Sequence, residues 1–257
     1  MTGTDPLVVT WIGHATVLVE IDGVRILTDP ALTASVAHLR RRRPAPTLDD
    51  VDVVAISHLH MDHLHRPSLR QIARAKPAVL LPTGSASLLS GLRLTDVREM
   101  RPGDSVEVAK RGGVVRIDAL HAEHSGARGP HSRLSAHAMG YVFRSKNRSV
   151  YFAGDTDIFD AMADVGPVDV ALVPVWGWGP TLGERHLNPI TAARATALLK
   201  PRHVIPIHWG TYSPVRARRG NPSWLDNPLH AFRDALDDHG LGNRLIELWP
   251  GDSTTIP

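Results

Sequence analysis

The chain has 257 residues, a formal net charge of +3 and a hydrophobic fraction of 42%, which is enough apolar material to bury a core. It has no cysteine, so disulfides and cysteine-ligated zinc sites are excluded, and any bound metal must be held by His, Asp, Glu and water. No apolar run approaches the roughly 20 residues that span a bilayer, and the N-terminal stretch MTGTDPLVVTW lacks a signal-peptide pattern. We therefore expect a cytoplasmic protein.

The first third of the chain predicts mainly β-structure. Short runs rich in β-branched residues are separated by turn signals, and the pair Asp22-Gly23 between two of them predicts a hairpin. The run at 51–57 is apolar nearly throughout, which favours a strand buried on both faces, and a helical pattern follows at 67–76. The strands expected here are residues 7–12, 16–21, 24–29, 51–57 and 78–82.

Four consecutive arginines, Arg40, Arg41, Arg42 and Arg43, concentrate positive charge in one place. Runs of like charge usually form a solvated surface loop, which is our first interpretation. The alternative is a rim that attracts anionic substrates to an active site, and the sequence leaves open whether these arginines touch substrate. We expect no stable nucleic-acid partner, because neither a binding module nor interleaved aromatic residues accompany the run.

The segment SHLHMDHLH (57–65) gathers four histidines and an aspartate directly after an apolar run. His58 and His60 are two residues apart, so their side chains point to the same side of an extended backbone. Asp62 and His63 are adjacent and cannot share a direction, so they suit a second centre as the chain turns towards the following helix. Two groups of ligands on one short loop predict two metal ions close together, and a merely polar surface loop is the alternative.

Strands and helices are interspersed in the second half of the chain. Pro189 and Pro201 flank one amphipathic helix, and the proline within HVIPIHW (203–209) favours an edge strand or a strand end. The expected strands are 114–122, 138–144, 149–154, 169–175, 203–209 and 244–249, and the expected helices are 190–200 and 227–240. This pattern favours sheet packed on sheet with helices outside, in one compact domain over residues 1–257.

The segment His58-Leu59-His60-Met61-Asp62-His63 matches the His-x-His-x-Asp-His signature of the metallo-β-lactamase fold superfamily. Motifs resembling that superfamily's other ligands follow in order: His124 with Arg128 four residues later, Ala153-Gly154-Asp155-Thr156, and Ile207-His208-Trp209-Gly210. The resemblance implies an α/β (α+β) fold, a four-layer αββα sandwich.

Three further segments resemble one branch of the superfamily, which contains N-acyl-phosphatidylethanolamine phospholipase D and ascorbate-6-phosphate lactonase. They are Trp11-Ile12-Gly13-His14-Ala15-Thr16, Leu27-Thr28-Asp29-Pro30 and His186-Leu187-Asn188-Pro189. The resemblance thus extends over nearly the whole chain.

The resemblance assigns seven metal ligands. They are His58, His60 and His124 for site one, Asp62, His63 and His208 for site two, and Asp155 as a bridge. It implies a hydrolase with two zinc ions, manganese and iron(II) being the alternatives, in which a metal-bridging hydroxide attacks a small phosphodiester or lactone-like ester. Asp62 would help to orient the nucleophile, and His186 would donate a proton to the leaving group. A nuclease or another phosphoesterase of the same fold, and a di-iron oxidoreductase, are the rival functions.

Four more residues keep two interpretations each. His14 is either a hydrogen-bonded structural histidine or a contact in the cleft. Asp29 either orients a ligand histidine or caps a turn. His186 could instead cap the helix entry, and Arg128 either binds an anionic group or forms a structural ion pair.

The sequence Leu120-His121-Ala122-Glu123-His124 offers two candidates for one ligand position. His121 falls within a β-patterned run, whereas His124 falls in the loop that follows, where active sites normally carry their ligands. We expect His124 to bind metal and His121 to be dispensable for it.

Overall fold

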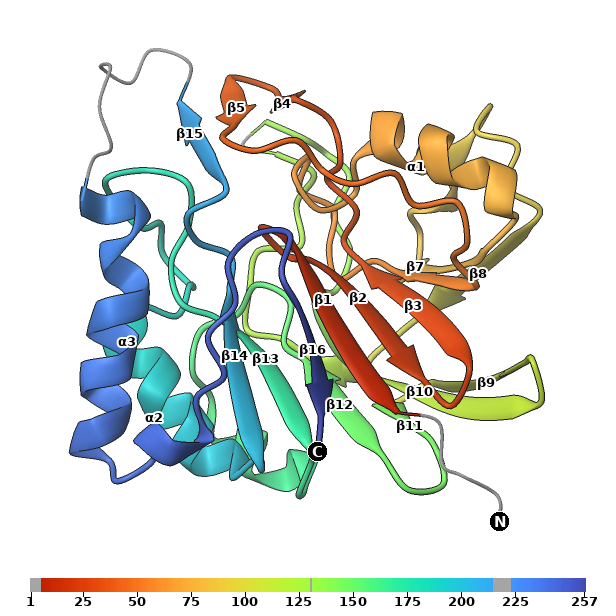
Figure 1. Cartoon of the computed structure of the whole chain (residues 1–257). Coiled ribbons are helices and arrows are strands. Elements are labelled where there is room, and N and C mark those ends of the chain that lie inside the picture. The colour runs from red at the N-terminus through yellow and green to blue at the C-terminus, as the bar shows by residue number, and fades with distance from the viewer. Residues whose placement is uncertain (1–5, 130, 215–222) are drawn as a thin grey trace.

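The computed structural model describes residues 6–129, 131–214 and 223–257. Two large β-sheets pack face to face with helices on their outer sides (Figure 1). The helices are α1 (Arg66–Ile72), α2 (Pro189–Leu199) and α3 (Asn227–Asp238), with short 3-10 helices at Ala73–Ala75, Ala86–Leu89, Asp160–Val165, Ser223–Leu225 and Gly242–Arg244. The expected αββα sandwich is confirmed. Residues 1–5, part of the N-terminal stretch discussed above, lie outside the described residues.

The first sheet has seven strands in the order β16-β1-β2-β3-β6-β7-β8. Its strands are β1 (Leu7–Gly13), β2 (Thr16–Ile21), β3 (Val24–Thr28), β6 (Val53–Ala55), β7 (Ala78–Pro82), β8 (Asp96–Met100) and β16 (Ser253–Ile256). Strands β16, β1, β2 and β3 are antiparallel, whereas β3, β6, β7 and β8 are parallel. The Asp22-Gly23 hairpin is confirmed, since both residues have positive φ, 50° and 75°, as the tight turn of a hairpin requires.

The second sheet has six strands in the order β14-β13-β12-β11-β10-β9. Its strands are β9 (Ser105–Lys110), β10 (Gly113–His121), β11 (Met139–Arg144), β12 (Ser149–Phe152), β13 (Val170–Pro174) and β14 (His203–Ile207). Here β12, β13 and β14 are parallel and the other pairs are antiparallel. A small third sheet joins β4 (Ser35–Val36), β5 (Leu39–Arg41) and β15 (Tyr212–Pro214).

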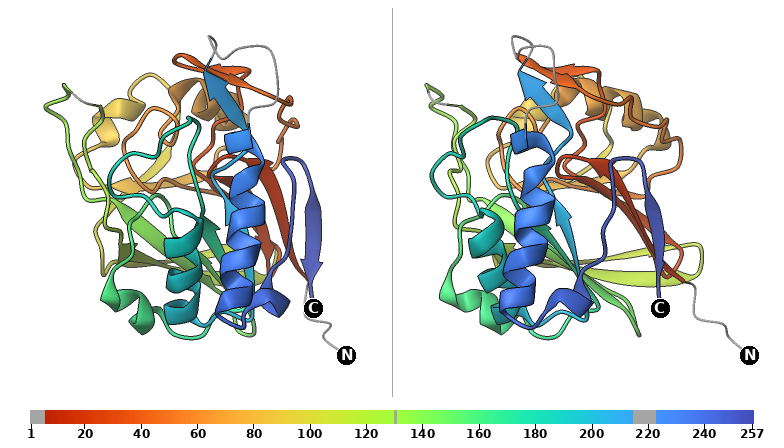
Figure 2. Two further views of the ribbon diagram at one scale, coloured as in Figure 1. Left: turned by 90° about the vertical axis from the view of Figure 1, so that its left-hand side faces the viewer. Right: turned by 60° about the vertical axis from the view of Figure 1, so that its left-hand side comes forward.

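Alternation along the strands divides the core into two layers. On β6, Val53 and Ala55 face the cluster between the sheets, whereas Val54, and Ile56 directly after the strand, face the cluster under α1. The views in Figure 2 show α2 and α3 packed on the outer side of the second sheet, where Phe232 of α3 joins the central cluster. Burial on both faces explains why the run at 51–57 is apolar nearly throughout.

The predicted elements differ from the observed ones at a few places. The sequence predicts a strand at residues 244–249, but the 3-10 helix Gly242–Arg244 ends there and the following residues form no strand, since Leu245 makes only an isolated bridge to Val204. The closing strand is β16 instead, which pairs with β1 at the edge of the first sheet. The expected edge position of the proline-containing strand is confirmed, because β14 ends the second sheet. Among the described residues, no helix combines the length and apolar character that crossing a membrane requires.

Candidate metal centre

The candidate metal centre lies where parallel strands of both sheets end. Asp29 follows β3, the segment 58–63 follows β6, Asp155 closely follows β12, and His208 follows β14. Since the strands before them run parallel within each sheet, their carboxyl ends meet at one edge. Ligand sites of open α/β sheets form at such edges.

Gly154 allows the two sheets to approach closely at this edge. Its φ is +63°, and a Cβ at this position would lie 2.7 Å from Ser57 Cβ and 3.0 Å from the carbonyl oxygen of Met139. A side chain here would push the backbone that carries Asp155 away from the segment that carries His58.

One group of ring nitrogens comes from His58, His60 and His124. His58 Nε2 lies 2.9 Å from His60 Nδ1, and His124 Nε2 lies 3.3 Å from the same atom. The three candidate ligand atoms lie within 4.8 Å of one another, close enough to share one metal ion. The fold brings His124 to this group from the loop after β10, while His121 points away with 54% of its side chain exposed.

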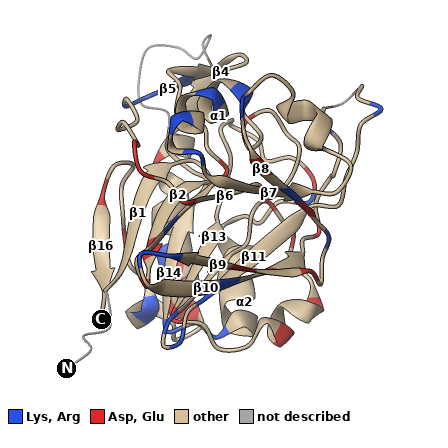
Figure 3. Cartoon of the chain, turned by 90° about the vertical axis from the view of Figure 1, so that its right-hand side faces the viewer, with Lys and Arg blue, Asp and Glu red and all other residues tan. Residues whose placement is uncertain are grey.

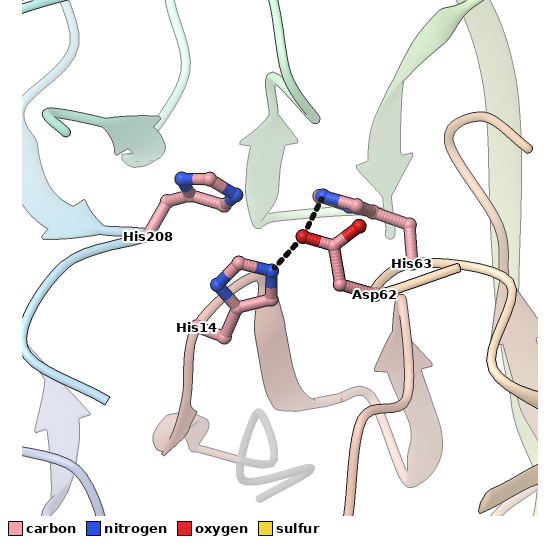
Figure 4. Close-up of side chains that lie close together, drawn as sticks. All are labelled: His14, Asp62, His63 and His208. Atoms are coloured by element: carbon pink, nitrogen blue, oxygen red, sulfur yellow. Dashed lines mark hydrogen bonds and ion pairs between the residues drawn. The ribbon is translucent and has the colours of Figure 1, made fainter. Parts of the chain in front are cut away.

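A second group contains Asp62, His63 and His208, joined by His14. Figure 4 shows the four side chains pointing toward one another, and each offers a ligand atom within 4.8 Å of the others. His14, His63 and His208 are buried, whereas Asp62 keeps 17% of its side chain exposed. The structure thus favours the cleft-contact interpretation of His14, although the sequence did not indicate which residues it would meet.

The carboxylate of Asp155 lies between the two groups. Its Oδ2 is 3.2 Å from His63 Nε2 and 4.0 Å from His124 Nε2, and its Oδ1 is 3.2 Å from His208 Nε2. Burial would raise the pKa of Asp155, but His208 and His63 outweigh it and hold that pKa well below its usual value. A buried, ionised carboxylate in contact with both groups is suited to bridging two cations.

Asp29 orients rings in both groups. Its Oδ2 lies 2.8 Å from His63 Nδ1 and accepts a hydrogen bond from Ser57 Oγ. Ser57 Oγ in turn lies 2.9 Å from His58 Nδ1. The structure thus favours the orienting interpretation of Asp29 over a turn cap, because bonds on the outer nitrogen fix the direction in which the inner nitrogen points.

Backbone carbonyls orient two further rings in the same way. His124 Nδ1 lies 2.8 Å from the carbonyl oxygen of Arg185, and His208 Nδ1 lies 2.7 Å from that of Trp176. Their Nε2 atoms are therefore left facing the centre.

Burial keeps most of these imidazoles neutral, as metal binding requires. Burial and neighbouring histidines lower the pKa of His60 to about 4 and that of His58 well below its usual value. Burial also lowers the pKa of His208 to about 3. His63 is the exception: burial opposes its protonation, but Asp155 and the other nearby carboxylates raise its pKa well above the usual value.

The residues present fit a bound metal. Asp155 Oδ1, His63 Nε2 and His208 Nε2 are buried and make no hydrogen bond to any of the described residues. Buried polar atoms are nearly always hydrogen-bonded, so three ligand atoms that face one another without a hydrogen bond call for a cation between them.

His186 stands at the margin of this centre. Its Nε2 lies 3.5 Å from Asp155 Oδ2, and 21% of its side chain is exposed. Burial opposes protonation of His186, but the bond to Asp155 raises its pKa. It does not cap α2, because Asn188 does so by accepting from the backbone N–H groups of Ile190 and Thr191.

Arg128 acts on the backbone of the metal-binding loop. Its guanidinium donates to the carbonyl oxygens of Leu59, His60 and Leu64, the last at 2.8 Å. Neither sequence interpretation, an anion contact or an ion pair, describes this role. Burial lowers the pKa of Arg128.

The arginine run divides between interior and surface. Figure 3 shows positive charge at β5 and on α1. Arg41 is nevertheless only 7% exposed, and it donates to the carbonyl oxygens of Ala31 (2.7 Å) and Arg43 (2.8 Å). The solvated-loop interpretation is therefore wrong for Arg41, whereas Arg40 and Arg43 are exposed.

A groove of about 600 Å³ opens beside His124. Its lining includes Arg101, His121, Glu123, His137 and Arg185. Glu123 lies 3.6 Å from Arg185. The two arginines, Arg101 and Arg185, outnumber the single carboxylate, Glu123, among these lining residues, and this excess of positive charge favours anionic ligands.

Comparison with known proteins places this geometry in a family. The domain described as "Beta-lactamase superfamily domain" matches residues 24–209. The chain is 34% identical over 254 residues to N-acyl-phosphatidylethanolamine-hydrolyzing phospholipase D 1 of Caenorhabditis elegans, covering 90% of this chain and 70% of that protein. It is 31% identical to a metal-dependent hydrolase of Methanopyrus kandleri, covering 95% and 98% of the two chains.

Solved structures share the fold. A metallo hydrolase from Ignicoccus hospitalis superposes with a TM-score of 0.72 at 23% identity and covers 98% of both chains. A diiron beta-hydroxylase from Streptomyces venezuelae gives 0.70 at 22% identity, covering 97% of this chain and 54% of its own. One fold therefore carries proteins named for different chemistries.

Proposed function

The chain belongs to the beta-lactamase superfamily, and from that premise we propose that it is a metal-dependent hydrolase that binds two metal ions and cleaves a phosphodiester or a lactone-like ester. The observation that carries the proposal is the convergence of two ligand groups on Asp155, with Asp155 Oδ1, His63 Nε2 and His208 Nε2 buried and without a hydrogen bond among the described residues. We also propose that residues 1–257 form one domain, in keeping with the single core cluster to which both sheets contribute.

The ligand groups divide between two ions. His58, His60 and His124 would hold one, Asp62, His63 and His208 the other, and Asp155 would bind both. Imidazole and carboxylate ligands suit zinc, and also manganese and iron(II). When bound, such ions supply the positive charge that makes a water acidic enough to attack near neutral pH and that polarises the ester.

The chain's own residues would orient the attacking water and supply a proton to the leaving oxygen. Asp62 is the partly exposed carboxylate of the centre, so it accepts a hydrogen bond from the attacking water and orients it. His186, at the margin of the centre, donates a proton to the leaving oxygen from Nε2. Asp29 and Ser57 keep His63 and His58 aligned throughout.

Two observations favour a phosphodiester over a neutral lactone. The groove beside His124 is lined by Arg101 and Arg185, which attract an anionic group. The relative from Caenorhabditis elegans is named for hydrolysis of a phospholipid.

Metal content tests the first half of the proposal. Purified wild-type protein should contain about two metal ions per chain, because seven ligands make two sites. Replacement Asp155→Ala should reduce the occupancy of both sites, whereas the nearby surface change Asp160→Ala should reduce neither. One tight ion, together with unchanged binding in the Asp155 variant, would contradict the two-metal site.

A substrate screen tests the second half. Phosphodiesters, lactones, thioesters and β-lactams should be offered to the same metal-analysed sample. We expect hydrolysis of a phosphodiester or a lactone that is abolished by a chelator and restored by added metal. Turnover that persists in metal-free protein would show that the assignment as a metal-dependent hydrolase is wrong.

A further inference from the structure

His14 occupies the turn between β1 and β2 in a backbone conformation that residues other than glycine seldom adopt. Its φ is +56°. Its N–H donates to Thr211 Oγ1 at 2.6 Å, and its carbonyl oxygen accepts from the backbone N–H of His208 at 3.0 Å and from the indole N–H of Trp11 at 2.9 Å. Such a conformation persists where surrounding contacts impose it, and it is concentrated at functional sites.

These contacts aim the imidazole of His14 at the second ligand group. Nε2 lies 3.1 Å from Asp62 Oδ2, and the ring centroid lies 4.0 Å from that of His208 (Figure 4). The side chain is 2% exposed. His14 therefore contacts all three residues that would hold the second ion: Asp62 by a hydrogen bond, His63 ring to ring at a centroid distance of 5.1 Å, and His208 through both ring and main chain.

Asp62 needs such a partner more than the other ligands do. His63 is fully buried and is oriented by Asp29, and His208 is oriented by the carbonyl of Trp176. Asp62 is the most exposed residue of its group. A carboxylate at an open edge can rotate into water, and a hydrogen bond from a rigidly held donor prevents this rotation.

We propose that His14 is a positioning residue for the second metal ion, with its Nε2–H donating to Asp62 Oδ2 so that the carboxylate faces His63 and His208. The proposal rests on the two-metal site described above. Within the described residues His14 makes no hydrogen bond or ring contact with His58, His60 or His124, so its effect falls on one site and spares the other.

Two substitutions separate the hydrogen bond from the backbone conformation. In His14→Asn the new residue tolerates the left-handed backbone, but its amide nitrogen reaches only the place of Nδ1, so the donor to Asp62 is lost. In His14→Gln the amide nitrogen reaches the place of Nε2 and restores that donor. The matched control is His65→Asn, a buried histidine that bonds Ser68 Oγ at 2.8 Å and lies outside both ligand groups.

The experiment titrates metal-free protein with Zn²⁺ alone, without substrate, and follows both binding events by calorimetry. His14→Asn should weaken one of the two binding events by about 10–100-fold, the range for residues that orient ligands, and leave the other unchanged. His14→Gln should recover most of the loss, and His65→Asn should match wild type. The absorption bands of the Co²⁺-substituted protein should shift in the Asn variant and return in the Gln variant.

Three outcomes would overturn the positioning role: wild-type affinity in His14→Asn, equal losses in the Asn and Gln variants, or parallel weakening of both binding events. Wild-type protein that binds fewer than two Zn²⁺ ions would instead refute the two-metal site itself, so the two failures are distinguishable.

Discussion

At the scale of residues, Arg41 shows that adjacent residues of the same type can have different structural roles. It is buried and donates to the carbonyl oxygens of Ala31, between β3 and the small sheet, and of Arg43, just after β5. It also approaches the turn before His14: a Cβ on Gly13, whose φ is +128°, would lie 2.8 Å from Arg41 Nη2. Arg41 thus fixes the loop on which His14 stands, while Arg40 faces solvent.

Substitution of the two arginines should separate these roles. Arg41→Ala leaves buried carbonyl oxygens without donors and should lower the free energy of unfolding by about 2–4 kcal/mol. Arg40→Ala, at an exposed position, should change it by less than about 0.5 kcal/mol. Denaturant unfolding of the two variants measures both values, and equal stabilities would contradict the interior role of Arg41.

The pair His121 and His124 gives a second prediction at this scale. His124→Ala should lose metal from the first site and nearly all turnover, because its Nε2 lies within 4.0 Å of both His60 Nδ1 and Asp155 Oδ2. His121→Ala should retain both ions and lose at most about 10–100-fold in kcat, since its side chain lies 3.5 Å from Glu123 on the surface. Metal content and kcat of the two variants decide between them, and the reverse ranking would mean that the ligand is misassigned.

At the scale of elements, each ligand is placed by the end of a strand and each strand end is secured by a neighbour. Arg128 holds the loop after β6 through three carbonyl oxygens, and Gly154 admits close packing after β12. The start of α2 is secured by a capping box, in which Asn188 and Thr191 exchange side-chain and backbone hydrogen bonds. His186 lies two residues before this cap.

Loss of the cap should therefore cost stability. Asn188→Ala leaves the N–H groups of Ile190 and Thr191 unpaired and should lower the free energy of unfolding by about 1 kcal/mol. Asn188→Ser keeps a side-chain acceptor at this position and should recover most of that loss. Thermal unfolding of the pair measures the effect, and an unaffected Ala variant would show that the capping bonds contribute nothing.

At the scale of the whole molecule, the proposed metal ions would link the two sheets. Asp29 and the segment 58–63 come from the first sheet, whereas Asp155 and His208 come from the second. Ions held between them would bind the folded chain and not the unfolded one, so binding would raise the free energy of unfolding.

Metal removal should consequently lower the melting temperature. Free metal at 1,000 times its dissociation constant adds about 4 kcal/mol of stability per site, so a chelator should shift unfolding to lower temperature and added Zn²⁺ should reverse the shift. In Asp155→Ala the shift should be much smaller. An identical melting temperature with and without chelator in the wild type would argue against metal ions that bridge the sheets.

The sequence by itself determined the local features of this protein. The spacing of His58, His60, Asp62 and His63 is a property of consecutive residues, as are the Asp22-Gly23 hairpin and the apolar runs that became strands. Each depends on side-chain direction within one element, which alternation along a strand or a turn preference already defines. The order of motifs also sufficed to recognise the family.

Only the tertiary structure decided which distant residues meet. His14 lies beside Asp62 because β1 and β6 belong to one sheet, and it lies beside His208 because the two sheets converge at one edge. Strand order and sheet packing also account for two other differences: Arg41 is buried, and β16 forms the closing strand in place of the one expected at 244–249. Contacts of this kind depend on strand order and sheet packing, which are set by the burial of the whole core rather than by any local pattern.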